Sequence, residues 1–197
     1  MDRDQAWEIV KEHVQDPGLR RHMLCVEAAI RGYAERLGGD VEIWGQAGLL
    51  HDFDWEVHPS LEAHPVEGAP ILRERGVDEE VIRMILTHNT AGTGVDREKP
   101  GDFALLACDE ITGLITAATL VRPSKDIRDV QVKSIKKKWK DRAFAAGVDR
   151  DHVQEATADF SRACFDGSLE LWEHVGNVLE SLQGVAESLE LDGRLAG

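Results

Sequence analysis

Apolar residues recur at every third or fourth position along most of the chain, the spacing that places them on one face of an α-helix. The clearest run contains Leu19, Met23, Val26, Ile30, Tyr33 and Leu37. Comparable stretches lie at about residues 2–15, 40–51, 65–75, 78–89, 102–121 and 168–191. The alternation of apolar and polar residues that is typical of half-buried strands is absent. The pattern therefore predicts an all-α fold.

Capping and helix-breaking residues divide these helices. Asp2 and Asp78 are suited to cap the helices that follow them, and we expect Pro17-Gly18 and Gly38-Gly39 to end the first two helices. The segment 90–101 contains three glycines and a proline and is predicted to be a loop. We expect one helical domain over residues 1–150 and a C-terminal helical extension, 151–197, packed on it.

Net charge and cysteine content limit the binding partners and the cellular compartment that we expect. The formal net charge is −14, whereas proteins that bind nucleic acid or anionic membranes present basic surfaces. We therefore expect neither a large nucleic acid nor a membrane as a partner. The three cysteines are far apart and are expected to be reduced core residues. No apolar stretch typical of a signal peptide follows Met1, which predicts a cytoplasmic protein.

One apolar segment contains acids. Residues 103–121 are about long enough to span a membrane, but Asp109 and Glu110 lie inside this segment. We interpret it as a core helix. Burial of an unpaired carboxylate is strongly unfavourable, so Asp109 requires a cation, a set of hydrogen-bond donors or a metal.

Two histidines and a further aspartate also lie beside apolar residues. His22 borders the apolar stripe of the second helix, and His51 and Asp52 directly follow an apolar run. Taken singly, His22 could be structural and His51 could interact with the end of its helix. Together with Asp109, these residues form a mixed nitrogen and oxygen set, which suits Mn, Fe, Co, Ni or Zn better than Ca or Mg alone. Such sites recur in helical bundles.

The order His, His-Asp, Asp on successive helices resembles the HD-domain superfamily of metal-dependent phosphohydrolases. The matching segments are LRRHMLCVEAA, AGLLHDFD, HPVEGAPILRERGVDEEVIRMILTHN and LLACDEITGLI. The resemblance covers about residues 18–122. It implies an HD-domain helical bundle in which His22, His51, Asp52 and Asp109 bind a divalent metal, with the two aspartates as the catalytic carboxylates.

Two more histidines match members of the superfamily that have a larger site. His64 and His88 lie where those members hold a second metal, bridged to the first by the aspartate of the His-Asp pair. Each could instead cap a helix end or contact the phosphate. The resemblance thus implies one or two ions. The remaining histidines match no motif and are expected at the surface: His13, His58, His152 and His174.

The residues after the His-Asp pair depart from the familiar pattern. Many members continue with Ile-Gly and often a lysine, whereas this chain continues with Phe53, Asp54, Trp55 and Glu56. The phosphate-binding role of that lysine therefore does not transfer. Asp54 could accept a hydrogen bond from a ligand imidazole, or it could cap a turn.

Basic residues are concentrated after the Asp109 helix. Residues 121–142 contain 9 of the 23 lysines and arginines. We expect Arg122, Lys125 and Lys133 to contact the phosphate of a substrate. The other lysines of this stretch, Lys136, Lys137, Lys138 and Lys140, are expected to be solvated. The stretch TLVRPSKDIRDVQVKS also resembles a poorly characterised branch of predicted HD hydrolases.

These observations lead to a ranked set of functions. The first is metal-dependent hydrolysis of a nucleotide or another small phosphate mono- or diester by activated water. The second is oxidation by a di-iron HD oxygenase. The third is a non-catalytic nucleotide-binding module. The complete set of metal ligands argues against it, because a binding module has no need of open coordination positions on a metal.

Overall fold

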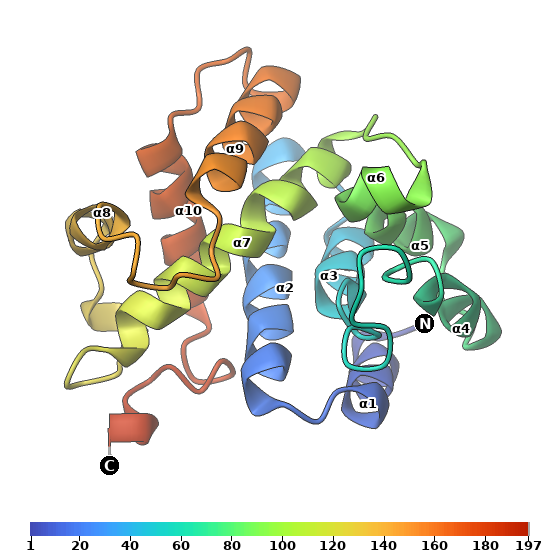
Figure 1. Cartoon of the computed structure of the whole chain (residues 1–197), viewed down its shortest axis with the longest axis horizontal. Helices are drawn as coiled ribbons and strands as arrows, with labels where there is room; N and C mark the ends of the chain where they lie inside the picture. The colour runs from blue at the N-terminus through green and yellow to red at the C-terminus, as the bar shows by residue number, and fades with distance from the viewer. Residues whose placement is uncertain (197) are drawn as a thin grey trace. The chain divides into compact units, whose positions relative to one another are not determined.

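The computed structural model describes residues 1–196 and is built of helices (Figure 1). The α-helices are α1 (Arg3–His13), α2 (Pro17–Leu37), α3 (Val41–Leu50), α4 (Gly68–Glu74), α5 (Glu79–Leu86), α6 (Thr90–Thr93), α7 (Pro100–Leu120), α8 (Val132–Trp139), α9 (Arg150–Cys164) and α10 (Leu171–Gly184). The 3-10 helices are η1 (Thr87–Asn89), η2 (Ile127–Asp129) and η3 (Arg194–Ala196). Within residues 1–196 there is no β-strand. The all-α prediction is confirmed.

The chain forms two compact units, and the boundary between them falls inside α7. The first unit comprises residues 1–105, and the second begins at Leu106. Each unit has its own buried apolar residues. Residues 151–197, the predicted extension, contain all of α10 and all of α9 except its first residue.

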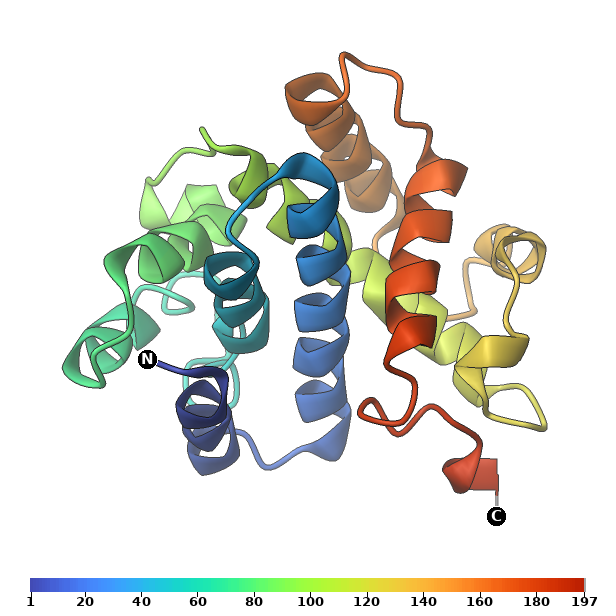
Figure 2. The ribbon, with the colours of Figure 1, turned by 180° about the vertical axis from the view of Figure 1, so that it is seen from behind.

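The first unit is organised around α3. This helix packs on α2, α1 and α5, and α2 and α3 lie side by side in both views (Figures 1 and 2). Gly48 permits the close approach, because a Cβ at this position would lie 2.8 Å from Ile30 Cγ2 and 3.0 Å from the Glu27 backbone. A larger residue here would push α2 and α3 apart, and these are the helices that carry or precede His22 and His51.

Aspartates begin the helices of the first unit. Asp2, Asp16, Asp40 and Asp78 each accept hydrogen bonds from backbone N–H groups of the following turn. The predicted caps at Asp2 and Asp78 are confirmed. Pro17 is the first residue of α2 rather than the end of α1, which suits a residue whose missing N–H is not needed there.

Two segments of the first unit contain or closely follow predicted site residues. Residues 51–67 form a series of turns between α3 and α4. The predicted loop at residues 90–101 begins with the short helix α6, for which the Asn89 side chain accepts a hydrogen bond from Gly92 N–H. The loop prediction is therefore wrong for Thr90–Thr93.

The second unit contains the rest of α7 and the helices α8, α9 and α10. α10 packs on α8 and α9, and Figure 2 shows its full length. Its buried face includes His174, which has no exposed surface. The prediction that His174 lies at the surface is wrong, because this residue falls in phase with the buried Val178 and Leu182 of the same helix.

α7 is long and apolar enough to cross a membrane by length and composition. In its most apolar window, however, 61% of the residues are buried inside the molecule. This burial is what the core helix of a globular protein shows, and it agrees with the interpretation made from Asp109 and Glu110.

Candidate metal centre

Five polar side chains of the first unit converge on one place. His22 comes from the second turn of α2, His51 and Asp52 directly follow α3, His64 comes from the turns before α4, and His88 from η1. His51 and His64 are buried, and Asp52 retains about a fifth of its side-chain exposure. The ligand atoms form two groups that share Asp52.

The first group contains His22 and His51. Their Nε2 atoms are 3.3 Å apart. Asp52 Oδ2 lies 3.4 Å from His51 Nε2 and 3.8 Å from His22 Nε2. The approach of α2 and α3 at Gly48 brings these two histidines together.

The second group contains His64 and His88. Their Nε2 atoms are 2.8 Å apart. The other carboxylate oxygen, Asp52 Oδ1, lies 3.2 Å from His64 Nε2 and 3.9 Å from His88 Nε2. Each oxygen of Asp52 therefore faces a different pair of imidazoles, which is the arrangement of a carboxylate that bridges two cations.

Hydrogen bonds fix the orientation of three of these rings. Nδ1 of His51 lies 2.8 Å from the Gly48 carbonyl, and Nδ1 of His88 lies 2.5 Å from the Ile85 carbonyl. A carbonyl only accepts, so both Nδ1 atoms carry a proton, and in the neutral ring each Nε2 atom offers a lone pair. Nδ1 of His64 likewise donates to Asp54.

This donor chemistry fits a metal. With Nδ1 committed as a donor, the Nε2 atoms of His64 and His88 would direct two lone pairs at each other across 2.8 Å. Such an arrangement requires a positive species between them, either a proton or a metal cation. Imidazole nitrogens and a carboxylate are ligands for Mn, Fe, Co, Ni and Zn.

The pKa shifts of Asp52 and His64 also favour a positive species between these side chains. Burial raises the pKa of the Asp52 carboxyl, but the neighbouring imidazoles, His51 foremost, outweigh burial and hold its pKa well below the usual value. Burial lowers the pKa of His64, but hydrogen bonds to Asp52 and Asp54 outweigh it and raise the pKa to about 9. Without a metal, the second group thus holds a proton where a cation would lie.

Asp54 accepts a hydrogen bond from the imidazole of His64, a candidate ligand, which is one of the two roles that the sequence left open. It has no exposed surface, and its Oδ1 lies 2.7 Å from His64 Nδ1. A carboxylate behind a metal-binding histidine fixes the ring and its tautomer.

The other predicted site residues lie in the second unit. Asp109 is a half-buried residue of α7, and its backbone carbonyl accepts a hydrogen bond from Thr112. Arg122 has a buried Nε with no hydrogen-bond partner among the described residues. Lys125 donates to the Leu195 carbonyl at 2.7 Å, and Lys133 is exposed at the start of α8.

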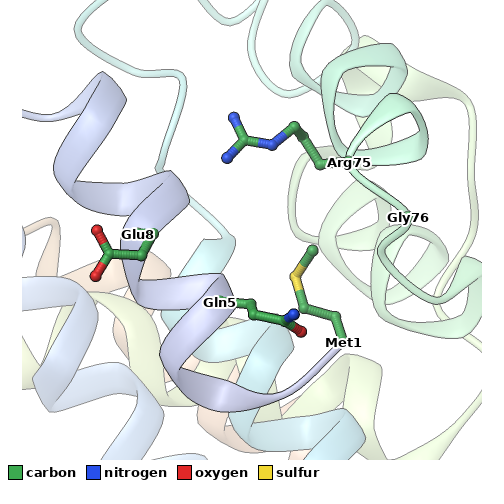
Figure 3. A pocket seen from close by; sticks show the side chains of 5 residues that line it. All are labelled: Met1, Gln5, Glu8, Arg75 and Gly76. Carbon is green, nitrogen blue, oxygen red and sulfur yellow. The ribbon is translucent and has the colours of Figure 1, made fainter.

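A cavity of about 460 Å³ in the first unit lies elsewhere. It is lined by Met1, Gln5, Glu8, Arg75 and Gly76, and none of the predicted site residues borders it (Figure 3). Glu8 is paired with Lys11, and Arg75 is paired with Glu12. These charges already have partners, so the cavity offers no cluster of ligand atoms.

Comparison with known proteins agrees with this geometry. The family model of the HD domain matches residues 19–113. Ribonuclease Y of Cutibacterium acnes is 35% identical over 92 residues, which are 45% of this chain and 16% of that protein. The tRNA (cytidine(56)-2'-O)-methyltransferase of Picrophilus torridus is 28% identical over 101 residues, 51% of this chain and 29% of that protein. The chain thus spans less than a third of either relative. No solved structure matches it.

Proposed function

The chain belongs to the HD-domain superfamily through residues 19–113, and on this premise we propose that it is a divalent-metal-dependent phosphohydrolase. The observation that carries the proposal is Asp52, each oxygen of which faces a separate pair of imidazoles. We propose two ions, one held by His22 and His51 and the other by His64 and His88, with Asp52 between them. The proposed substrate is a nucleotide or another small phosphate mono- or diester.

The side chains would divide the work as follows. Bound divalent ions polarise a phosphoryl oxygen and lower the pKa of a coordinated water. The low pKa of Asp52 keeps this carboxylate negatively charged at neutral pH, so that it would balance part of the positive charge of the cations. Nδ1–H donation by His51 and His88 to backbone carbonyls keeps their Nε2 lone pairs available.

Residues of the second unit complete the proposal. The resemblance assigns Asp109 as a further carboxylate ligand of the first ion. Arg122 is the strongest candidate for a phosphate contact, because its buried Nε lacks a partner among the described residues and a guanidinium binds phosphate in a bidentate manner. Lys133 is a second candidate, being exposed and without an ion pair in the described part of the chain. Lys125 is a weaker candidate because it already donates to Leu195.

The names of the relatives guide the choice of substrates for testing. Ribonuclease Y is named for the cleavage of RNA, which places phosphodiesters beside monoesters among the substrates to test. The acidic composition favours short substrates over large nucleic acids. We further propose that the protein works in the cytoplasm.

The test is a matrix of metals and substrates. Protein stripped of metal is reloaded without oxygen with Mn, Fe, Co, Ni or Zn. It is then assayed with an aryl phosphate, an aryl phosphodiester, nucleotides and a short RNA. We expect release of phosphate, aryl alcohol or shortened RNA only with metal, and loss of activity in Asp52→Asn. Asp102→Asn replaces a carboxylate of the same unit that lies outside the two ligand groups and is the matched control. Hydrolysis that survives complete chelation would contradict the proposal.

Metal stoichiometry tests the number of ions. Elemental analysis should give about two ions per chain, falling toward one in the His64→Ala, His88→Ala double variant. One ion in both proteins would refute the dinuclear assignment. Oxygen consumption without hydrolysis would favour the di-iron oxygenase, and metal-independent nucleotide binding without turnover would favour the binding module.

A further inference from the structure

The four residues after the His-Asp pair each make a specific contact in the first unit. Phe53 is fully buried, and its ring packs edge-on against His13. Asp54 and Trp55 both contact His64. Glu56 accepts hydrogen bonds from the backbone N–H groups that precede α2. This segment replaces the Ile-Gly and lysine that follow the pair in many HD proteins.

Asp54 lies directly behind His64. Its Oδ1 lies 2.7 Å from His64 Nδ1, and its Oδ2 is buried with no hydrogen-bond partner in the described residues. The position is tightly enclosed, because a Cβ at Gly68 would lie 2.5 Å from Oδ2. Burying a carboxylate in this way is unfavourable unless its charge meets a positive group, and the imidazole of His64 is the group it touches.

Trp55 and Glu56 restrict the same region from two other sides. The Trp55 ring meets the His64 ring edge-on, with centroids 5.1 Å apart and an angle of 90° between the planes. Glu56 binds the N–H groups of Gln15 and Asp16 at 2.8 to 3.1 Å. Asp16 caps α2, the helix that carries His22. The segment 53–56 therefore connects the elements that hold both ligand groups.

We propose that Asp54 is the positioning residue of the second ion: it holds His64 so that Nε2 faces Asp52 Oδ1 and His88. The inference rests on the proposed function and assigns a role to a residue outside the ligand set. In this chain, the stretch that supplies a phosphate-binding lysine elsewhere serves to orient a metal ligand. A ring released from Asp54 would be free to rotate and to place its proton on Nε2, which would remove the lone pair that the ion requires.

The metal experiment compares Asp54→Ala, Asp54→Asn and the wild type. Asp54→Ala should weaken the second ion by about 10- to 100-fold, the usual effect of losing a carboxylate behind a metal-binding histidine, with the first ion unchanged. Asp54→Asn should lose less affinity for the second ion, because its amide oxygen still accepts a hydrogen bond from His64 Nδ1–H. Asp102→Asn should leave both dissociation constants unchanged, since Asp102 is equally buried but binds Arg83 instead. Calorimetric titration with Mn measures both sites.

A double-variant cycle separates positioning from general destabilisation. If Asp54 acts through His64, then Asp54→Ala should weaken the second ion no further in a His64→Ala background. Equal second-ion affinity in folded Asp54→Ala and the wild type would overturn the inference. So would similar losses at both ions, or fully additive effects of the two substitutions.

A metal-free measurement distinguishes failure of this inference from failure of the proposed function. A proton donated by His64 Nδ1 to a buried carboxylate exchanges slowly with water and gives a downfield NMR resonance. We expect this resonance in the metal-free wild type and its loss in Asp54→Ala. A wild type that shows the resonance but binds no metal would refute the proposed function and leave the contact of Asp54 with His64 in place. Absence of the resonance from the wild type would overturn the positioning role itself.

Discussion

Mild acid should destabilise the second unit through a single histidine, His174. This residue of α10 has no exposed surface, and its Nε2–H donates to the Ala107 carbonyl at 2.8 Å. The Phe160 ring lies on another side, with the ring centroids 6.1 Å apart. Burial lowers the pKa of His174 from 6.5 to about 4, and the hydrogen bond to Ala107 offsets only part of this effect. The folded protein therefore holds His174 neutral.

The sign and size of the effect follow from proton linkage. The unfolded chain protonates His174 near pH 6.5, whereas the folded chain does so only near pH 4. Between these values the unfolded state binds more protons, so the free energy of unfolding decreases as the pH falls. The loss from pH 7 to pH 5 is about 2 kcal/mol, approaching about 3 kcal/mol at pH 4. The stability of the folded protein is therefore free of this loss only above the pKa that His174 has in the unfolded chain.

Urea denaturation at pH 7, 6 and 5, followed by tryptophan fluorescence, measures this loss; Trp139 and Trp172 of the second unit contribute to the signal together with three tryptophans of the first unit. His174→Gln removes the titrating group and keeps an N–H donor, so its stability should change less with pH than that of the wild type. The difference corresponds to a shift of about 1 M in the urea midpoint for a slope near 2 kcal/mol per M. Parallel pH profiles for the two proteins would refute the reasoning, as would an NMR titration of His174 with a midpoint near pH 6.5.

Three further outcomes follow from the structure. Gly48→Ala should lower the free energy of unfolding by about 1 to 3 kcal/mol, because the added Cβ would overpack α2 against α3; an unchanged urea midpoint would show that the helices can separate without cost. Asp52→Asn should bind fewer ions than His22→Ala or His64→Ala, because both groups share this carboxylate; elemental analysis decides, and two retained ions would exclude a bridging role. Asp109→Ala should abolish hydrolysis and tight metal binding, whereas Lys137→Ala, at an exposed position, should leave both unchanged; metal retained in Asp109→Ala would assign a structural role to that residue.

The helices of the first unit were predictable because their signals are local. Aspartate caps and the left-handed Gly38 at the end of α2 act within one turn of the chain. The apolar stripe of α2 also places His22 beside the core by periodicity alone. The meeting of His22 with His51 depends on how α2 packs against α3, and a family resemblance was needed to anticipate it.

The second ligand group was less predictable because it is assembled from irregular backbone. His64 lies among turns, and His88 lies in a short 3-10 helix. Neither position follows from a periodic pattern, so helix capping, metal binding and a phosphate contact were all consistent with the sequence. The role of Asp54 was open for the same reason, since the pairing with His64 spans ten residues of turns.

α9 was missed because its buried positions are not strongly apolar. The face of α9 that packs inward includes Thr157 and Ser161 beside Val153 and Phe160. Small hydroxyl side chains fill these positions, and Thr157 satisfies its hydroxyl on the Val153 carbonyl. A periodicity argument that counts only large apolar residues finds too few of them here to predict a helix. His174 was misplaced for a different reason, since the absence of a motif match was taken to imply exposure.

The distribution of charge along the chain suggests that chemistry and substrate selection are encoded separately. The stretch after the His-Asp pair contains the acids Asp54 and Glu56 and no cation, so it cannot neutralise a phosphate. In the proposed function that charge would be met by metal ions and by basic side chains from elsewhere, and residues 121–142 contain 9 of the 23 lysines and arginines. The ligand segments are constrained by the coordination demands of a metal, which are the same for every substrate. In the basic segment, Ile127, Val130 and Ile135 are buried, whereas Lys133 is exposed and is free to vary with the molecule it would contact. If Arg122 and Lys133 contact the phosphate as proposed, substituting them should alter which phosphate compound is accepted while the proposed metal ligands of the first unit stay unchanged.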